Sequence, residues 1–141
     1  MAGLSVDDEE LWSAWKRATE SVHARINADV SSGTGLSEAD VSVLTHLQEG
    51  ERLRQSALGS LMGWHRSRLS HHLTRMADRG LVVRTSVAGG VEVRATTMGR
   101  AALLKARPVH ADAVRRHLVD GVPPRDRARL LALLRMLSEP R

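Results

Sequence analysis

Apolar residues recur every three or four positions over most of this chain, which is the spacing of amphipathic helices. The first such run begins after Ser5 and Asp8, which are spaced as a capping box, and it ends at the SSGTG break of residues 31–35. A long N-terminal helix is therefore predicted here. Its apolar positions are Leu11, Trp15, Ala18, Val22 and Ile26.

Two short helices are predicted next. A second capping pattern, Ser37 with Asp40, begins a helix that ends at Gly50. Ser56 is then placed to cap another short helix, which ends at Gly63. The apolar positions of these two helices are Val41, Leu44, Leu47, Leu58, Leu61 and Met62.

The helix predicted over residues 65–80 has one apolar side and one polar side. Leu69, Leu73 and Met76 share the apolar side, and His72 falls nearer to it, where we expect it to pack. The final glycine is a good left-handed cap. Hydroxyl, imidazole and guanidinium groups occupy the polar side, from Ser67, Arg68, Ser70, His71, Thr74 and Arg75.

A β-hairpin is predicted after this helix. Two β-rich runs, LVVRT and VEVRAT, are joined by the glycine-containing stretch SVAGG. In the second run, Val91 and Val93 alternate with Glu92 and Arg94, as in a half-buried strand. The glycines serve the turn between the strands.

Two more helices are predicted in the C-terminal region. Thr96 or Thr97 caps the first, and Pro108 should kink or split it because proline lacks a backbone donor. The second follows the DGVPP break, and its apolar positions are Leu130, Leu133, Leu134 and Leu137. The predicted fold is mainly α with a small β-hairpin, and it has four helices before the hairpin and two after it.

The amino-acid composition and the net charge restrict the kinds of molecule that this protein is expected to bind. The 141 residues suffice for one domain, and the formal net charge is +5, although four carboxylates lie within the first ten residues. A basic surface favours polyanions. With three tryptophans and no phenylalanine or tyrosine, few rings are present on which single-stranded bases could stack. We see neither a cationic leader nor an apolar run of membrane-spanning length, so we expect a cytoplasmic protein.

The order of the predicted elements indicates a role for the basic helix. Two short helices joined by a tight turn and followed by a hairpin form a winged helix-turn-helix, whose second helix enters the major groove of duplex DNA. Arg75, Arg79 and Arg84 are better placed for phosphates than for bases. A solvated basic helix face is the alternative interpretation, but the surrounding elements favour DNA binding. The residues expected to face the groove are Arg66, Ser67, Arg68, Ser70 and His71.

Residues 54–84, RQSALGSLMGWHRSRLSHHLTRMADRGLVVR, together with VRATTMGRAAL and the early EELWSAWKRA, resemble the MarR family of bacterial winged helix-turn-helix transcription regulators. The most specific features are RGLVVR and the Thr-x-x-Gly helix start from Thr96 to Gly99. The resemblance implies a homodimer formed by the N- and C-terminal helices, whose two lobes read a pseudo-palindromic operator. It implies a dimerisation helix (1–35), a DNA-binding lobe (36–96) and C-terminal dimerisation helices (97–141).

The wing departs from the family's pattern. Family members usually carry Asp-x-Arg or a similar pair at the wing tip, whereas no charge lies between Thr85 and Val91 here. This turn therefore lacks the arginine that usually makes the wing contact, although Arg84 and Arg94 on the strands can still reach phosphates. The residues that we expect at the DNA are Arg54, Gln55, Ser56, His65, Arg66, Ser67, Arg68, Ser70, His71, Arg75, Arg84 and Arg94.

The resemblance also implies a small aromatic or anionic effector, bound between the dimer helices and the lobes. Arg52 can supply a countercharge to an acid. The regulator would block polymerase or, less often, recruit it. Repression would follow from occupying promoter DNA, and the effector would release the protein from that DNA. The alternative function is a winged-helix protein-interaction module without specific DNA binding. The candidate pocket residues are Trp12, Trp15, His23, His46 and Arg52.

The sequence gives little support for metal binding or for catalysis. His65, His71 and His72 lack the spacing that would place two metal ligands on one helical face. The absence of cysteine excludes disulfides and thiol catalysis. Motifs such as Gly-x-Ser-x-Gly, His-Glu-x-x-His and a phosphate-binding glycine loop are missing. We therefore expect no metal, no cofactor and no enzymatic activity.

Overall fold

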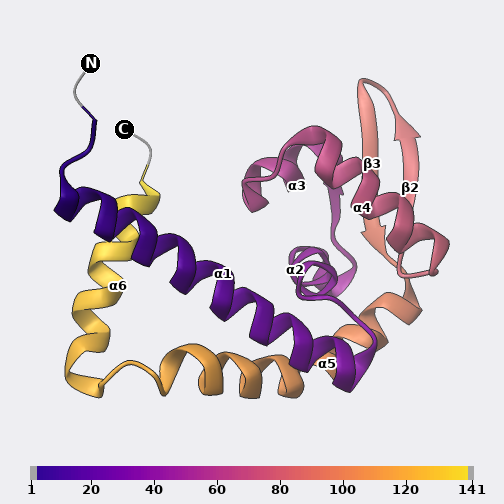
Figure 1. Cartoon of the computed structure of the whole chain (residues 1–141). Helices are drawn as coiled ribbons and strands as arrows, with labels where there is room; N and C mark the ends of the chain where they lie inside the picture. The colour runs from indigo at the N-terminus through magenta and orange to yellow at the C-terminus, as the bar shows by residue number, and fades with distance from the viewer. Residues whose placement is uncertain (1–2, 140–141) are drawn as a thin grey trace.

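The computed structural model describes residues 3–139 as six α-helices and one three-stranded antiparallel sheet (Figure 1). The predicted mainly α fold with a β-hairpin wing is confirmed. The helices are α1 (Val6–Thr34), α2 (Glu38–His46), α3 (Gln55–Met62), α4 (Arg66–Asp78), α5 (Thr97–Val114) and α6 (Pro124–Ser138). The strands are β1 (Arg52–Arg54), β2 (Val82–Val87) and β3 (Gly90–Ala95). The remaining short segments are the 3-10 turn η1 (Gln48–Gly50) and the π-helical η2 (Arg115–Val119).

Hydroxyl side chains cap the beginnings of three of the helices. The hydroxyl oxygens of Ser5, Ser37 and Thr96 each accept a hydrogen bond from the backbone N–H three residues later. The prediction that Ser56 caps α3 is wrong. That helix already begins one residue earlier, with Arg54 in the N-cap position, because strand β1 leads into it without an intervening loop.

The wing is a three-stranded sheet with β3 in the centre. Val93 on β3 pairs with Leu53 of β1 on one side and with Arg84 of β2 on the other. The turn between β2 and β3 consists of Ala88 and Gly89, and Gly89 has a φ of 80° that favours glycine. The sequence predicted the hairpin but missed β1, which has only three residues.

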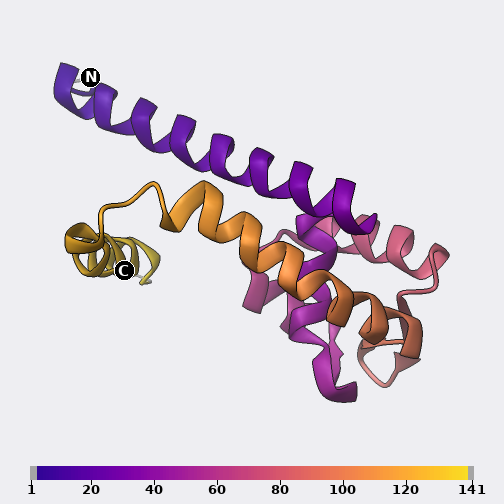
Figure 2. The same cartoon turned by 90° about the horizontal axis from the view of Figure 1, so that it is seen from below.

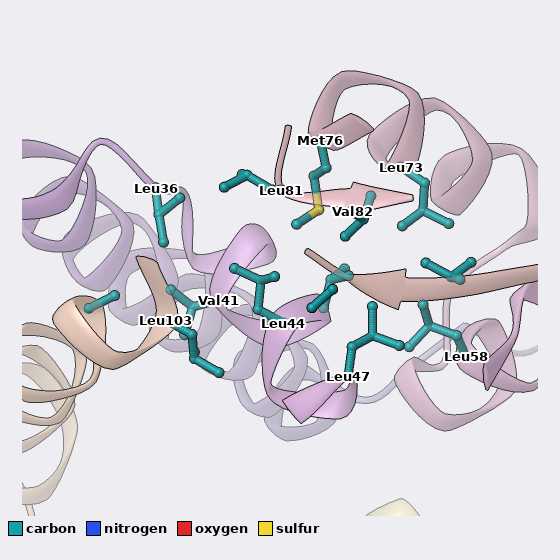
Figure 3. Close-up of a cluster of buried hydrophobic side chains, with 14 of the residues drawn as sticks. Leu36, Val41, Leu44, Leu47, Leu58, Leu73, Met76, Leu81, Val82 and Leu103 are labelled. Atoms are coloured by element: carbon teal, nitrogen blue, oxygen red, sulfur yellow. The ribbon is translucent and has the colours of Figure 1, made fainter. Parts of the chain in front are cut away.

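A single hydrophobic core holds the lobe together (Figure 3). It lies between α2, α3, α4 and the sheet. Helix α5 packs against α2 and β3 and covers the remaining side of the core. Ile26 and Val30 extend it to the end of α1. The recognition-type helix α4 is thus fixed by its apolar side. The largest fully buried apolar side chains are Leu44, Leu47, Leu58, Leu69, Leu73, Met76, Val30, Val43, Val82 and Val93.

The other long helices extend away from the lobe. Helices α1 and α5 run side by side, and α6 turns off beyond the end of α5 (Figures 1 and 2). Arg116 donates a hydrogen bond of 2.8 Å to Oδ2 of Asp29, and Nε2 of His117 lies 2.7 Å from the same oxygen. These contacts tie η2 to α1. Helix α6, by contrast, buries none of its residues within the chain.

Proline does not split α5. The helix continues through Pro108, which is exposed, so the carbonyl four residues earlier, on the exposed Leu104, can be hydrated instead of bonded. The irregularity falls later, where η2 continues the helix with π geometry. Within residues 3–139, no helix is both long enough and apolar enough to cross a membrane.

Candidate nucleic-acid interface

Helix α4 is held in a helix-turn-helix arrangement with α3. Gly63 ends α3 with a φ of 65°, and His65 caps α4 by accepting a hydrogen bond from the backbone N–H of Ser67 on Nδ1. Leu69, Leu73 and Met76 are buried against the lobe, as their spacing predicts. The opposite side of α4 therefore faces outward.

The outward side of α4 is basic and rich in hydrogen-bond donors. Most of the side chains expected at a DNA groove are exposed, and Ser70 is half-buried. Because they lie in the first turns of the helix, these groups occupy the part of a recognition helix that contacts base edges. The exposed members of the set are Arg66, Ser67, Arg68 and His71. The N-cap residue His65 is exposed as well, as is Arg75 in the last turn, which was expected at a phosphate.

Trp64, in the turn before α4, holds one of these side chains. The Cζ atom of Arg68 lies 3.8 Å from the centroid of the Trp64 ring, a close cation–π contact. The edge of the same tryptophan meets the ring of His72, with 5.5 Å between centroids and an interplanar angle of 84°. The spacing of residues along the chain did not predict this contact between Trp64 and Arg68.

A buried carboxylate anchors the inner side of α4. Asp40 is 2 % exposed, Nε2 of His72 lies 2.9 Å from its Oδ1, and Nη1 of Arg79 donates a hydrogen bond of 2.7 Å to its Oδ2. Arg75 approaches Nδ1 of the same imidazole at 3.3 Å, so the ring proton belongs on Nε2, facing the carboxylate. The cluster therefore ties α4 to the start of α2.

The electrostatics of Asp40 follow from these partners. Burial raises the pKa of its carboxyl, but hydrogen bonds from His72, from Arg79 and from the backbone N–H of Ser37 outweigh this and hold the pKa well below its usual range. Arg79 also donates to the carbonyl of Gly35 at the end of α1. Arg79, which was expected at a phosphate, thus uses both of its Nη atoms for hydrogen bonds within the protein. His72 is buried as expected, but as the partner of a carboxylate rather than as an apolar filler.

The wing carries its basic residues away from its tip. Arg84 on β2 donates a hydrogen bond of 2.8 Å to the hydroxyl of Thr74, which ties the wing to the exposed side of α4. Arg94 on β3 is half-buried and pairs across the sheet with Arg52 of β1 and with Val83 of β2. The turn itself has no charged side chain.

An open cleft of about 610 Å³ lies between α3, the start of α4 and the wing turn. It combines two guanidinium groups, from Arg54 and Arg66, with the hydroxyl-bearing residues Ser56 and Ser60 and with the glycines of the turn. The Oε1 atom of Gln55 is buried here and has no hydrogen-bond partner among the described atoms. Cationic and hydroxyl groups at the mouth of a groove suit contact with phosphate oxygens.

The candidate effector residues do not meet within one chain. Trp12 and Trp15 are exposed on the first half of α1, whereas Nδ1 of His23 lies 2.9 Å from a carboxylate oxygen of Glu38. The two remaining residues lie further along the lobe, His46 at the end of α2 and Arg52 at the start of β1. Among residues 3–139, no group of three or more His, Cys, Asp or Glu side chains is arranged to hold a metal ion.

A basic helix held by its apolar side, preceded by a helix and a tight turn and followed by a small antiparallel sheet, defines a DNA-binding winged helix-turn-helix. A family model described as MarR family matches residues 34–90, which cover the lobe from the end of α1 to the wing turn. Over these residues the chain resembles the MarR family of transcription regulators.

Solved structures of similar proteins match almost the whole length of this chain. AbsC, a MarR family transcriptional regulator from Streptomyces coelicolor, has 28% sequence identity and a TM-score of 0.84, and the match covers 98% of this chain and 96% of AbsC. Sco3205 from the same organism, solved in complex with DNA, has 25% identity and a TM-score of 0.87 over 99% of this chain and 91% of that chain. BpsR from Bordetella bronchiseptica has 19% identity, a TM-score of 0.85 and coverage of 99% and 100%, and shows the shared fold. A comparison with curated proteins gave no match.

Proposed function

We propose that this protein is a sequence-specific repressor that binds a pseudo-palindromic DNA operator as a homodimer. The observation that carries the proposal is the side-chain arrangement of α4, whose apolar residues are buried while Arg66, Arg68 and His71 stand exposed in its first two turns. A helix of this kind fits the major groove. The similar protein Sco3205 was solved in complex with DNA, which supports the same use of this fold here.

Within this proposal the basic residues divide into two groups. Arg66, Arg68 and His71 read base edges, since arginine can donate two hydrogen bonds to guanine. The groups around the helix ends and the wing contact the backbone and position the protein. Ser67 and Ser70 face the groove and can bond to either a base or a phosphate. The residues proposed for backbone contact are Arg54, Gln55, Ser56, His65, Arg75, Arg84 and Arg94.

The homodimer is supported by apolar surface that the single chain leaves uncovered. Trp12 and Trp15 on α1 and Leu133, Met136 and Leu137 on α6 are all more than two-fifths exposed. Such a surface on a protein of this size marks an interface. A second copy covers it in our proposal, and the two lobes then present their recognition helices to half-sites about one turn of DNA apart, ~34 Å.

A small aromatic or anionic effector completes the proposal. The DNA binding of BpsR is regulated by 6-hydroxynicotinic acid, which is an anionic aromatic compound. In this chain Trp12, Trp15, His23, His46 and Arg52 offer rings and cationic or hydrogen-bonding groups for such a ligand, and the dimer would be needed to bring them together. Quenching of tryptophan fluorescence by a panel of aromatic acids tests this part, and no quenching across the panel would remove it.

The experiment that tests the main proposal is selection of bound sequences from a random duplex library, followed by binding measurements on the selected operator. Arg68→Ala should weaken operator binding by about 1–3 kcal/mol and relax the preference at one position of each half-site, whereas Arg75→Ala should weaken binding to all duplexes nearly equally. Operator affinity unchanged by both substitutions, in an intact dimer, would contradict the groove assignment. Failure to enrich any sequence would favour a winged-helix protein-interaction module instead.

A further inference from the structure

The wing of this protein has no positive charge of its own at the tip. Residues 85–91 contain no ionisable side chain. Arg84, just before them, donates to Thr74 of α4, and Arg94 lies toward the other end of β3. A wing tip without a cation would contribute little to binding a polyanion at that point, because phosphate contacts supply much of the affinity of such proteins.

Arg54 brings a guanidinium to this tip from another element. It ends β1 and is the N-cap residue of α3. Its Nη1 atom lies 3.4 Å from the position that a Cβ atom would occupy at Gly89, and equally 3.4 Å from that position at Gly90. The Arg54 side chain therefore extends along the sheet, and its guanidinium lies beside Gly89 of the turn and Gly90 at the start of β3.

The guanidinium of Arg54 remains available for a ligand. The residue is exposed. Glu92 is its cross-strand partner on β3, yet no ion pair within 4.0 Å joins Arg54 to a carboxylate among the side chains that the structure describes. Arg54 shares the cleft beside the turn with Arg66 of α4, so two cations line one groove.

We propose that Arg54 supplies the positive charge at the wing tip and binds a DNA phosphate at the wing turn. This inference rests on the proposed function, because α4 must lie in the major groove for the wing to face the adjoining backbone. Arginine suits the role, since its planar guanidinium can donate two parallel hydrogen bonds to phosphate oxygens. The charge thus comes from the residue before α3 rather than from the hairpin.

The experiment measures affinity against salt concentration for the full-length protein on two duplexes, the selected operator and one of random sequence. Arg54→Ala should weaken binding to both about tenfold. The slope of log affinity against log salt should become shallower by about two per dimer, because each neutralised phosphate contributes about 0.9. Lys105→Ala, which removes one exposed charge from α5, is the matched control and should leave the slope unchanged.

A second variant separates charge at the wing from a role of Arg54 in folding. Ala88 is exposed at the turn, so Ala88→Arg in the Arg54→Ala background returns a cation to the wing tip. Recovery of most of the affinity and of the slope supports the proposal. An unchanged slope in Arg54→Ala, an equal loss in Lys105→Ala, or no recovery in the double variant overturns it. Phosphate contact by Arg54 should be detectable on the random duplex whether or not the protein prefers a sequence. The proposed function, by contrast, fails if the wild type shows no preference for the operator over the random duplex.

Discussion

The guanidinium of Arg68 lies over the indole of Trp64, with Cζ 3.8 Å from the ring centroid. An exposed arginine normally loses rotamer freedom when it binds a base, and this loss opposes binding. Contact with a half-buried ring restricts the side chain before DNA arrives. Trp64 is therefore a positioning residue for the proposed base contact of Arg68.

Trp64→Leu should lower the preference for operator over random duplex by about 1 kcal/mol, which is the usual size of a cation–π contact. Trp64→Phe should retain part of the preference, because it keeps an aromatic face. The measurement is the ratio of the two dissociation constants, taken under conditions where urea unfolding shows each variant to be folded. In an Arg68→Ala background, Trp64→Leu should change this ratio no further. An undiminished ratio in the single variant would show that Trp64 only fills space.

The carboxylate of Asp40 predicts a specific dependence of stability on pH. Its pKa is lowered in the folded protein, so the stability that it contributes is fully present above the pKa of the unfolded chain, near pH 4, and is lost as the pH falls further. Asp40→Asn should cost about 3 kcal/mol of unfolding free energy at pH 7, since His72 and Arg79 lose their charged partner. Urea unfolding between pH 7 and pH 3 measures both effects, as the unfolding free energy of the wild type minus that of the variant at each pH.

The matched control for this prediction is Asp78→Asn, at the exposed end of α4. It should change stability by no more than about 0.5 kcal/mol at any pH. If the difference between wild type and Asp40→Asn stayed constant below pH 4, the carboxylate would not be the group that titrates.

The sequence predicted features that depend on neighbouring residues. The buried stripe of Leu69, Leu73 and Met76 follows from helical periodicity, and the caps at Ser37 and Thr96 involve groups only three residues apart. The outward direction of the proposed groove residues follows from the same periodicity. These parts of the fold and of the candidate surface required no knowledge of tertiary structure.

Contacts between residues that are far apart in the sequence were not predicted from it. The bond between Arg79 and Asp40 spans 39 residues, so nothing near Arg79 in the sequence showed that its charge was already engaged. Strand β1 is too short to show alternation, and only pairing with β3 identifies it. For the same reason the approach of Arg54 to Gly89 was not predictable, although Arg54 was expected at the DNA.

Gly99 lets the first turn of α5 pack directly against the backbone of Leu81, the residue before β2. A Cβ atom at this position would lie 2.1 Å from the carbonyl oxygen of Leu81, which is backbone and cannot move aside easily. Gly99→Ala gains about 1 kcal/mol of helix propensity, yet the overlap should cost more and leave a net loss of about 2 kcal/mol. Urea unfolding measures the loss. Gly121→Ala is the control, because its added Cβ meets only Leu118 O at 3.5 Å, and its stability should stay close to that of the wild type.

The uncovered side of α6 predicts how the protein assembles. Leu133 and Leu137 are 49% and 68% exposed and lie one helical turn apart on the same face. Replacing both with glutamate places two like charges in the proposed dimer interface, where burying unpaired carboxylates is strongly unfavourable. Sedimentation at micromolar concentration should show a dimer for the wild type and a monomer for Leu133→Glu/Leu137→Glu.

Loss of the dimer should also reduce DNA binding, because one lobe alone contacts only one half-site and loses the gain from linking two. The matched control is Leu133→Met/Leu137→Met, which keeps volume and apolar character and should remain dimeric with unchanged operator affinity. Helix α6 lies far from the wing and α4 in Figure 1, so a fall in operator affinity in the glutamate variant alone can only act through assembly. A dimer that survives the glutamates, or a wild type that sediments as a monomer, would contradict the architecture on which two-lobed operator binding depends.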